Sequence, residues 1–254
     1  MDAGHPRSDP GPPGRPGADP VEMAALAIAR ARVLERIARA CDEAGRDPAD
    51  VTLVAVSKLV PAARLRAAVA AGLVLLGENR VQEAEAKAPE VPGAQWTLVG
   101  PLQSNKARRA VELFASIESV DSVDLARRLD RLAGELRPGR PLPALLQVNV
   151  DADPGKAGFE PRALATALGD LVALPNLRLE GLMTIGRLAA DPDAARPTFR
   201  ALRRLADELR SRYPGLGGAL SMGMSDDYHA AVEEGATIVR VGRALFGERP
   251  AAAA

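Results

Sequence analysis

Lysine is scarce in this sequence, because only four of its 33 basic residues are lysines. They are Lys58, Lys87, Lys106 and Lys156. Arginine keeps its proton in a protein, whereas a buried lysine can lose its proton and act as a nucleophile. Since the chain uses arginine wherever a permanent positive charge will serve, a lysine at the end of an apolar run, such as Lys58, is the first candidate for chemistry.

Cysteine and histidine are also nearly absent. The lone Cys41 permits no internal disulfide, and the two histidines, His5 and His229, lie far apart in the sequence. No cluster of carboxylates suggests a metal site either, so we expect none. A chain with no disulfide to form suits the reducing cytoplasm.

The sequence also lacks a net charge and long apolar runs. The 33 acidic residues balance the 33 basic ones, so neither nucleic acid nor an anionic membrane is an indicated partner. No segment approaches the roughly 20 apolar residues that cross a bilayer, and the apolar stretch at 23–28 is too short for a signal peptide. Residues 1–20 are half proline and glycine, which predicts a disordered tail ahead of a single domain at 21–250.

Short apolar runs rich in β-branched residues alternate with helical patterns along the rest of the chain. A first helix is predicted from Val21 to Ala44. Strands are predicted at 51–56, 73–76, 96–99, 116–120, 144–150, 177–183, 219–222 and 237–241. Helices follow at 62–71, 80–87, 105–113, 122–134, 161–173, 194–212 and 226–234.

Eight strands separated by helices require parallel pairing with right-handed crossovers. This α/β pattern predicts a single (β/α)8 barrel, in which the N-terminal helix fills the place after the last strand. An open doubly wound sheet is the alternative. It is disfavoured because the first strand leads into Ser57-Lys-Leu-Val-Pro61, with no Gly-x-Gly turn for a dinucleotide.

The reactive groups of a barrel gather at the carboxyl ends of its strands. The predicted ends include Ser57-Lys58, residues 77–79, residues 100–106, Asn149, Met183-Thr184, residues 221–225 and Gly242-Arg243. Ser221–Ser225 and Gly242-Arg243 follow strands seven and eight, where barrels commonly hold phosphate. A phosphate opposite a lysine suits pyridoxal 5'-phosphate (PLP), and it also suits a sugar phosphate handled by a Schiff-base aldolase.

Several motifs resemble one known family in their order and spacing. They lie at residues 53–58, 77–83, 99–106, 147–149, 181–183, 220–227, 239–242 and 246–247. Over nearly all of residues 22–249, the sequence resembles the pyridoxal phosphate homeostasis proteins, which are similar to the barrel domain of alanine racemase. The resemblance implies the PLP-binding barrel called fold-type III.

The resemblance also implies roles for individual residues. Lys58 would hold PLP as an internal aldimine, Arg240 would face the pyridine nitrogen, and Asn79 would line the cofactor's side of the opening. The phosphate would be surrounded by Ser221, Gly223, Ser225, Gly242 and Arg243, with Met183 and Met224 as further cofactor-binding residues. Two positions depart from the family pattern, because Val60 replaces a frequent lysine and Arg243 replaces a threonine. Lys156 matches a lysine-containing loop of the family.

The apolar strand before Lys58 suggests how the amine would react. A lysine with a pKa near 10.4 is only about 0.04% neutral at pH 7. Lowering that pKa to about 7 would make about half of it reactive, at a cost of about 4.6 kcal/mol that burial and a nearby guanidinium could supply. We therefore expect burial at residue 58 to keep the amine uncharged.

A binding role is favoured over catalysis. In alanine racemase, a tyrosine from a further β-domain of the partner subunit supplies a second acid–base group. This sequence ends about a dozen residues after its last predicted strand, and Tyr213 and Tyr228 offer little substitute. We therefore expect a monomeric carrier that takes part in intracellular PLP homeostasis by holding PLP reversibly and delivering it to client apo-enzymes, with a minor or absent catalytic role. A single-domain PLP-dependent amino-acid racemase is the alternative.

Overall fold

Eight parallel strands pair in sequence order, and β1 pairs with both β2 and β8 to close the sheet into a barrel. The computed structural model describes residues 18–186 and 191–248. The strands are β1 Thr52–Val56, β2 Leu75–Glu78, β3 Gln95–Leu98, β4 Ser116–Val120, β5 Leu142–Gln147, β6 Leu177–Met183, β7 Ala219–Ser221 and β8 Ile238–Val241. The predicted (β/α)8 barrel is confirmed, and the open doubly wound sheet is excluded.

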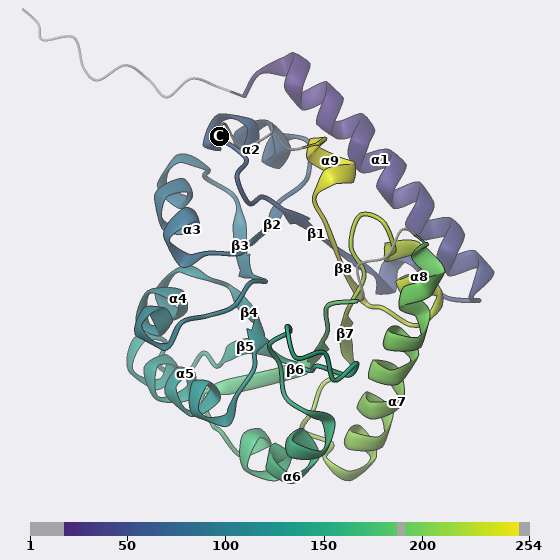
Figure 1. Cartoon of the computed structure of the whole chain (residues 1–254). Helices are drawn as coiled ribbons and strands as arrows, with labels where there is room; N and C mark the ends of the chain where they lie inside the picture. Colours follow the sequence, from purple (N-terminus) through teal and green to yellow (C-terminus); the bar gives the residue numbers. More distant parts are fainter. Residues whose placement is uncertain (1–17, 187–190, 249–254) are drawn as a thin grey trace, which may run out of the picture.

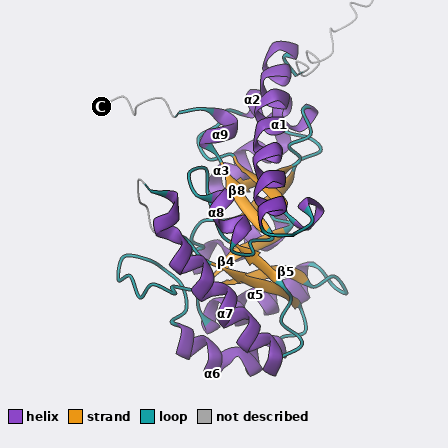
Figure 2. Cartoon of the chain, turned by 90° about the vertical axis from the view of Figure 1, so that its right-hand side faces the viewer, coloured by secondary structure: helices purple, strands orange, loops and turns teal. Residues whose placement is uncertain are grey.

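Helices surround the strands in a ring (Figure 1), and in the view turned by 90° they enclose the sheet from the sides (Figure 2). They are α1 Pro20–Glu43, α2 Ala62–Ala70, α3 Val81–Lys87, α4 Ala107–Leu113, α5 Val123–Leu136, α6 Pro161–Val172, α7 Arg196–Arg212, α8 Tyr228–Glu233 and α9 Arg243–Phe246. Short 3-10 helices occur at Pro48–Asp50, Ala88–Glu90, Ser104–Lys106 and Pro192–Ala195. None of the helices in the described ranges is both long and apolar enough to cross a membrane.

Helix α1 closes the ring between its first and last helices, as the sequence predicts. Asp19 caps its first turn by accepting a hydrogen bond from the Val21 N–H. Its apolar stripe, which includes the buried Leu26, Val33 and Ile37, packs where α1 meets α2, α8 and α9. Each fully buried side chain of this kind contributes about 1.5–3 kcal/mol, so the stripe fixes α1 firmly against the barrel. The predicted tail at 1–20 lies outside the described residues except for its last three.

Strand β2 lies two residues later than the sequence predicts. Gly77 and Glu78 were expected beyond the strand, yet they pair with Thr97 and Leu98 of β3. A side chain at Gly77 would lie 2.8 Å from Val54, so glycine is needed for close packing at this position. Glu78 is fully buried, because Lys87 and Ser57 bind its carboxylate. The charge therefore sits within the strand instead of marking its end.

Strand β5 likewise begins and ends earlier than the expected 144–150. Asn149 lies in the loop after it, and its side-chain amide donates hydrogen bonds to the carbonyl oxygens of Asp153 and Lys156. The Asn149 N–H in turn donates to the Phe159 carbonyl oxygen. Asn149 therefore orders the loop between β5 and α6, and the strand ends where this loop begins.

Candidate functional site

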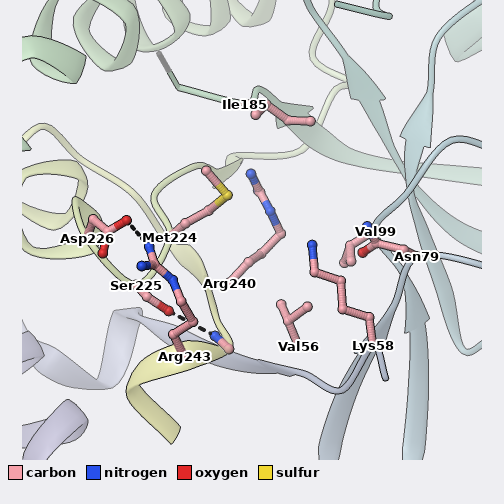
Figure 3. Close-up of a pocket in the computed structure, with 11 residues that line it drawn as sticks. Val56, Lys58, Asn79, Val99, Ile185, Met224, Ser225, Asp226, Arg240 and Arg243 are labelled. Carbon is pink, nitrogen blue, oxygen red and sulfur yellow. Dashed lines mark hydrogen bonds and ion pairs between the residues drawn. The ribbon is translucent and has the colours of Figure 1, made fainter. Parts of the chain in front are cut away.

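A cavity of about 440 Å³ opens at the carboxyl ends of the strands. It is lined by Val56, Lys58, Asn79, Val99, Ile185, Met224, Ser225, Asp226, Arg240, Gly242 and Arg243. Seven of these residues were predicted as site residues: Lys58, Asn79, Met224, Ser225, Arg240, Gly242 and Arg243. Figure 3 shows Lys58 entering from one side and the Ser225–Asp226 and Arg243 side chains lying on the other. The barrel thus brings together residues separated by up to 187 positions in the sequence, from Val56 to Arg243.

Lys58 faces the cavity because side chains alternate along the end of β1. Val56 and Lys58 line the cavity, whereas the intervening Ser57 is fully buried and donates its hydroxyl to the Glu78 carboxylate at 2.8 Å. The Ser57 N–H still pairs with the Gly77 carbonyl oxygen at 2.8 Å, so the sheet holds the chain up to the residue before the lysine.

Ser225 joins the loops after β7 and β8. Its hydroxyl oxygen accepts hydrogen bonds from the backbone N–H groups of Gly242 at 3.1 Å and Ala244 at 3.4 Å. Both N–H groups are therefore donated to Ser225 in this structure, and backbone N–H groups at such a turn also suit an anionic oxygen. The adjacent loops at Ser225 and Gly242 therefore form a compact cradle of hydroxyl and backbone donors.

Three predicted site residues lie outside the cavity lining. Met183 is fully buried in β6, and Ser221 is buried in β7, where its hydroxyl contacts Glu118 and Arg240. Gly223 has a φ of 89°, and a side chain there would come within 2.5 Å of the Ala231 side chain. Gly223 is needed for packing against α8, so the glycine pattern in this loop reflects backbone conformation as well as access to a ligand.

Arg240 places a buried guanidinium against the cavity. It is 4% exposed and donates to the Ser221 hydroxyl at 2.5 Å and to the Thr184 carbonyl oxygen at 2.8 Å. The Glu118 carboxylate lies 3.9 Å from it and accepts a hydrogen bond from Ser221 at 2.6 Å. Burial raises the pKa of Glu118, although Arg240 and the Ser221 hydroxyl oppose that rise. Ser221, a predicted phosphate ligand, thus bridges a buried acid and a buried base.

Sequence analysis did not identify four lining residues, Val56, Val99, Ile185 and Asp226. The strand alternation that turns Lys58 inward also turns Val56 inward, so this residue could have been found. Asp226 follows directly after Ser225, but nothing in the sequence indicates which way its carboxylate points. Val99 and Ile185 are apolar residues just beyond strands, where the sequence alone does not separate cavity from core.

Lys156 ties two neighbouring loops together near the cavity wall. Its ammonium donates to the carbonyl oxygens of Ile185 at 3.1 Å and Gly186 at 3.2 Å, and it pairs with Asp151 at 3.3 Å. The Asp151 carboxylate also accepts the Thr198 hydroxyl at 2.7 Å. Lys156 does not line the cavity itself, but it holds the Ile185 segment that does.

The motifs and the geometry can be compared with known proteins. Residues 28–250 match the family model described as alanine racemase, N-terminal domain. The pyridoxal phosphate homeostasis protein of Pseudomonas aeruginosa is 46% identical over 231 residues, which cover 89% of this chain and 97% of that protein. The Escherichia coli K12 protein of the same name is 39% identical over 228 residues, covering 86% and 94% respectively.

The chain belongs to the pyridoxal phosphate homeostasis protein family.

Solved structures agree with this membership. PipY of Synechococcus elongatus, in its structure with PLP bound, is 47% identical, with a TM-score of 0.74 over 85% of this chain and 100% of that chain. Alanine racemase from Corynebacterium glutamicum is 17% identical, with a TM-score of 0.70 over 91% of this chain and 63% of that chain. The second likeness concerns the fold alone.

Arg243 stands at the rim, where the resemblance to the family leads us to expect a threonine. Its guanidinium forms an ion pair with Asp226 and lies 3.8 Å from Glu248. Since its side chain is 44% exposed, water screens these interactions. The guanidinium that replaces the expected threonine hydroxyl is thus engaged by a carboxylate, whereas the Gly242 and Ala244 N–H groups are held by Ser225.

Proposed function

We propose that this protein binds PLP reversibly in the cavity at the carboxyl ends of its strands. The observation that carries the proposal is that Lys58 lines the same cavity as Ser225 and Gly242, whose loops offer hydroxyl and backbone donors to a phosphate. An amine on one side and an anion cradle on the other suit a ligand with an aldehyde and a phosphate. PipY, a relative at 47% identity, has a solved structure with PLP bound.

The residues present fit this cofactor. A cavity of about 440 Å³ lies in the usual range of small-molecule sites, about 300–1,000 Å³. Ser225, Gly242 and Ala244 would hold the phosphate, and Asn79 and Met224 would lie beside the ring. Arg240, held by Ser221 and Thr184, would face the pyridine nitrogen, where its permanent charge would discourage protonation of the ring. Met183, Ser221 and Gly223 would support these residues from behind.

Lys58 would supply the reversible covalent bond to the cofactor. When uncharged, its Nζ would be the group that bonds to the aldehyde carbon of the cofactor, and the carbonyl oxygen would depart with the two amine protons as one water molecule. Addition of water reverses the step and frees the aldehyde. When bound, the cofactor would supply a reactive carbonyl and an electron-withdrawing ring.

The lining of the cavity favours holding the cofactor over catalysis. Among the described lining residues, Asp226 is the one carboxylate, and it is paired with Arg243. Tyr228 is buried and Tyr213 follows the end of α7, so neither lines the cavity. We therefore propose a monomeric cytoplasmic carrier that releases PLP to client apo-enzymes.

The visible spectrum of the protein incubated with PLP tests the covalent link. We expect the wild-type protein to gain absorption near the violet edge of the visible range, and Lys58→Ala to lose it. Lys106→Ala, which removes a lysine outside the cavity lining, is the matched control and should keep the absorption. Colour that persists in Lys58→Ala, or a colourless wild-type protein, would contradict the proposal, and a Schiff-base aldolase would be colourless.

Exchange of the α-protons of amino acids distinguishes a PLP carrier from an amino-acid racemase. The PLP-loaded protein is incubated with single enantiomers of alanine and other amino acids in deuterated water, and deuterium at the α-carbon is followed by NMR. We expect at most slow exchange that ends well short of racemisation. Sustained exchange would overturn the holding role and favour the racemase.

A further inference from the structure

A buried network lies behind Lys58, on the side of β1 and β2 that faces α3. At its centre is Lys87, whose side chain is only 13% exposed. The Lys87 ammonium donates to Glu78 Oε1 at 2.6 Å, to the Ser57 carbonyl oxygen at 3.0 Å and to Glu83 Oε2 at 3.4 Å. Lys87, Glu78 and Glu83 are absent from the cavity lining, so any influence they have on a ligand must pass through other residues.

The number of hydrogen-bond acceptors around Lys87 equals the number of N–H donors on a lysine ammonium group. An ammonium group has three N–H donors around one nitrogen, and here three oxygens from three residues receive them. A guanidinium is planar and presents its donors in a fork, so it suits carboxylates approached side by side. In a chain that otherwise favours arginine strongly, a lysine at position 87 is therefore explained by this three-way geometry.

The network forms hydrogen bonds to backbone groups on both sides of Lys58. The Ser57 carbonyl bound by Lys87 belongs to the peptide that joins Ser57 to Lys58. On the other side, the Leu59 N–H donates to Glu83 Oε2 at 3.1 Å. The Ser57 hydroxyl donates to Glu78 Oε1 at 2.8 Å, and the Val60 N–H closes the turn on the Ser57 carbonyl at 3.0 Å.

The backbone conformation of Leu59 indicates that these hydrogen bonds hold a strained residue in place. Leu59 has a φ of 64°, and it is 68% exposed, so burial of its side chain does little to offset the cost of the conformation. A left-handed conformation costs a residue other than glycine about 1–2 kcal/mol and persists where the surroundings hold it. The hydrogen bond from the Leu59 N–H to Glu83 stabilises this conformation. The resulting turn directs the Lys58 side chain toward the cavity.

Lys87 also offsets part of the free-energy cost of burying the Glu78 carboxylate. Burial raises the pKa of Glu78, while the hydrogen bonds from Lys87 and Ser57 lower it. Glu78 Oε2 has no hydrogen-bond partner among the described residues, so Oε1 carries the contacts that hold the group in place. Without Lys87, Glu78 would be a buried acid held by one hydroxyl, and the hydrogen bonds around residue 57 would rearrange.

We propose that Lys87, together with Glu78 and Glu83, is a positioning residue that fixes the peptides on both sides of Lys58 so that its amine meets the aldehyde of the bound cofactor. The inference rests on the proposed PLP binding at this site. It assigns the network a role in the covalent bond to Lys58, and none in holding the phosphate or the ring.

Two ligands separate the covalent contribution to binding from that of the phosphate and ring. PLP can bond to Lys58, whereas 4-deoxypyridoxine 5'-phosphate has the ring and phosphate but no aldehyde. We expect Lys87→Met to weaken PLP binding about tenfold, as measured by equilibrium titration, and to leave the affinity for the aldehyde-free analogue unchanged. Lys106→Met is the matched control and should change neither affinity. Thermal melting of each unliganded variant reports folding separately.

Glu83→Ala offers a milder variant in case Lys87→Met folds poorly. It removes the acceptor of the Leu59 N–H, and we expect PLP binding to weaken about threefold with no effect on the analogue. Glu85→Ala is its control, because Glu85 lies on the same helix and pairs with Arg109 at the surface.

The outcomes distinguish this inference from the proposed function. Equal weakening of both ligands by Lys87→Met and Glu83→Ala would mean a general structural role, and unchanged PLP binding would mean no role, so either result would overturn the inference alone. Failure of the proposed function would appear earlier, as a wild-type protein that binds PLP no more tightly than the analogue and is unaffected by Lys58→Ala.

Discussion

The hydroxyl oxygen of Ser225 lies 3.1 Å from the backbone nitrogen of Gly242, so one hydrogen bond joins the loops after β7 and β8 at the rim of the cavity. A phosphate at this rim would meet the same hydroxyl and N–H groups. The relationship explains why two segments separated by a helix and a strand can act as one cradle.

Replacing Ser225 should therefore affect the phosphate end of the ligand selectively. We expect Ser225→Ala to weaken PLP binding about tenfold, because a charge-assisted hydrogen bond is lost. Pyridoxal, which has the aldehyde but no phosphate, should react with the variant as it does with the wild-type protein. Titration with both ligands is the measurement, and Ser211→Ala at the exposed end of α7 is the control. Equal losses for the two ligands would contradict a phosphate role.

The buried pair of Arg240 and Glu118 leads to a prediction about stability. Arg240→Met should lower the free energy of unfolding by about 3 kcal/mol, because it leaves Glu118 buried without its cation. The double variant Arg240→Met/Glu118→Gln should recover at least half of that loss. Chemical denaturation without ligand is the measurement, and Arg243→Met should change stability by no more than about 0.5 kcal/mol. A double variant as unstable as the single one would refute the pairing.

Glu234 leads to a prediction about pH. Burial alone would raise its pKa, but hydrogen bonds from Arg200 and Arg196 lower it overall, below the ordinary value of 4.5. The resulting stability is fully present above pH 4.5 and is lost as pH falls through the folded-state pKa. We expect Glu234→Gln to cost about 2 kcal/mol at pH 7, because it weakens two partly buried charged contacts.

That difference between wild-type and Glu234→Gln should shrink when urea unfolding is repeated at pH values below 4.5. Glu208→Gln, which breaks an exposed pair with Arg212, should cost no more than about 0.5 kcal/mol at pH 7. A Glu234→Gln difference that stays constant as the pH falls would mean that the carboxylate charge is not responsible.

Gly223 leads to a prediction about packing. Gly223→Ala should lower the free energy of unfolding by about 3 kcal/mol, because it adds left-handed strain and a clash with Ala231 on α8. Gly139→Ala is a matched control, since Gly139 has a φ of 71° with nothing within 4 Å of the added atom. It should cost only about 1 kcal/mol, the backbone part of the effect. Equal losses at the two positions would show that packing against α8 is unimportant.

The barrel was predictable because each strand and helix carries its own pattern. The alternation of β-branched runs with helical segments sets the order of elements, and parallel strands joined by helices leave few topologies. The register of β2 was wrong because Gly77 and Glu78 have the composition of a loop. They belong to the strand because they pair with β3, and the burial of Glu78 there depends on Lys87, which approaches from α3 and is not indicated by any local pattern.

The site was predictable in outline for a similar reason. Strand ends meet at one rim, so Lys58, Ser225 and Gly242 could be grouped before their distances were known. Asp226, Val99 and Ile185 were missed because their orientation depends on loop conformation. The support of Lys58 by Lys87 depends on three contacts, of which only the pair with Glu83 has a helical spacing in the sequence, whereas no spacing relates Lys87 to Ser57 or Glu78.

Helix α1 contacts α8 and α9, elements that lie nearly two hundred residues further along the chain. It is synthesised before the rest of the barrel, yet two of the three helices that meet its apolar stripe, α8 and α9, come after all or nearly all of the strands. Its Leu26, Val33 and Ile37 therefore stay incompletely covered until α8 and α9 have been synthesised. Slow long-range closure and exposure of this stripe to chaperones during synthesis are the expected consequences.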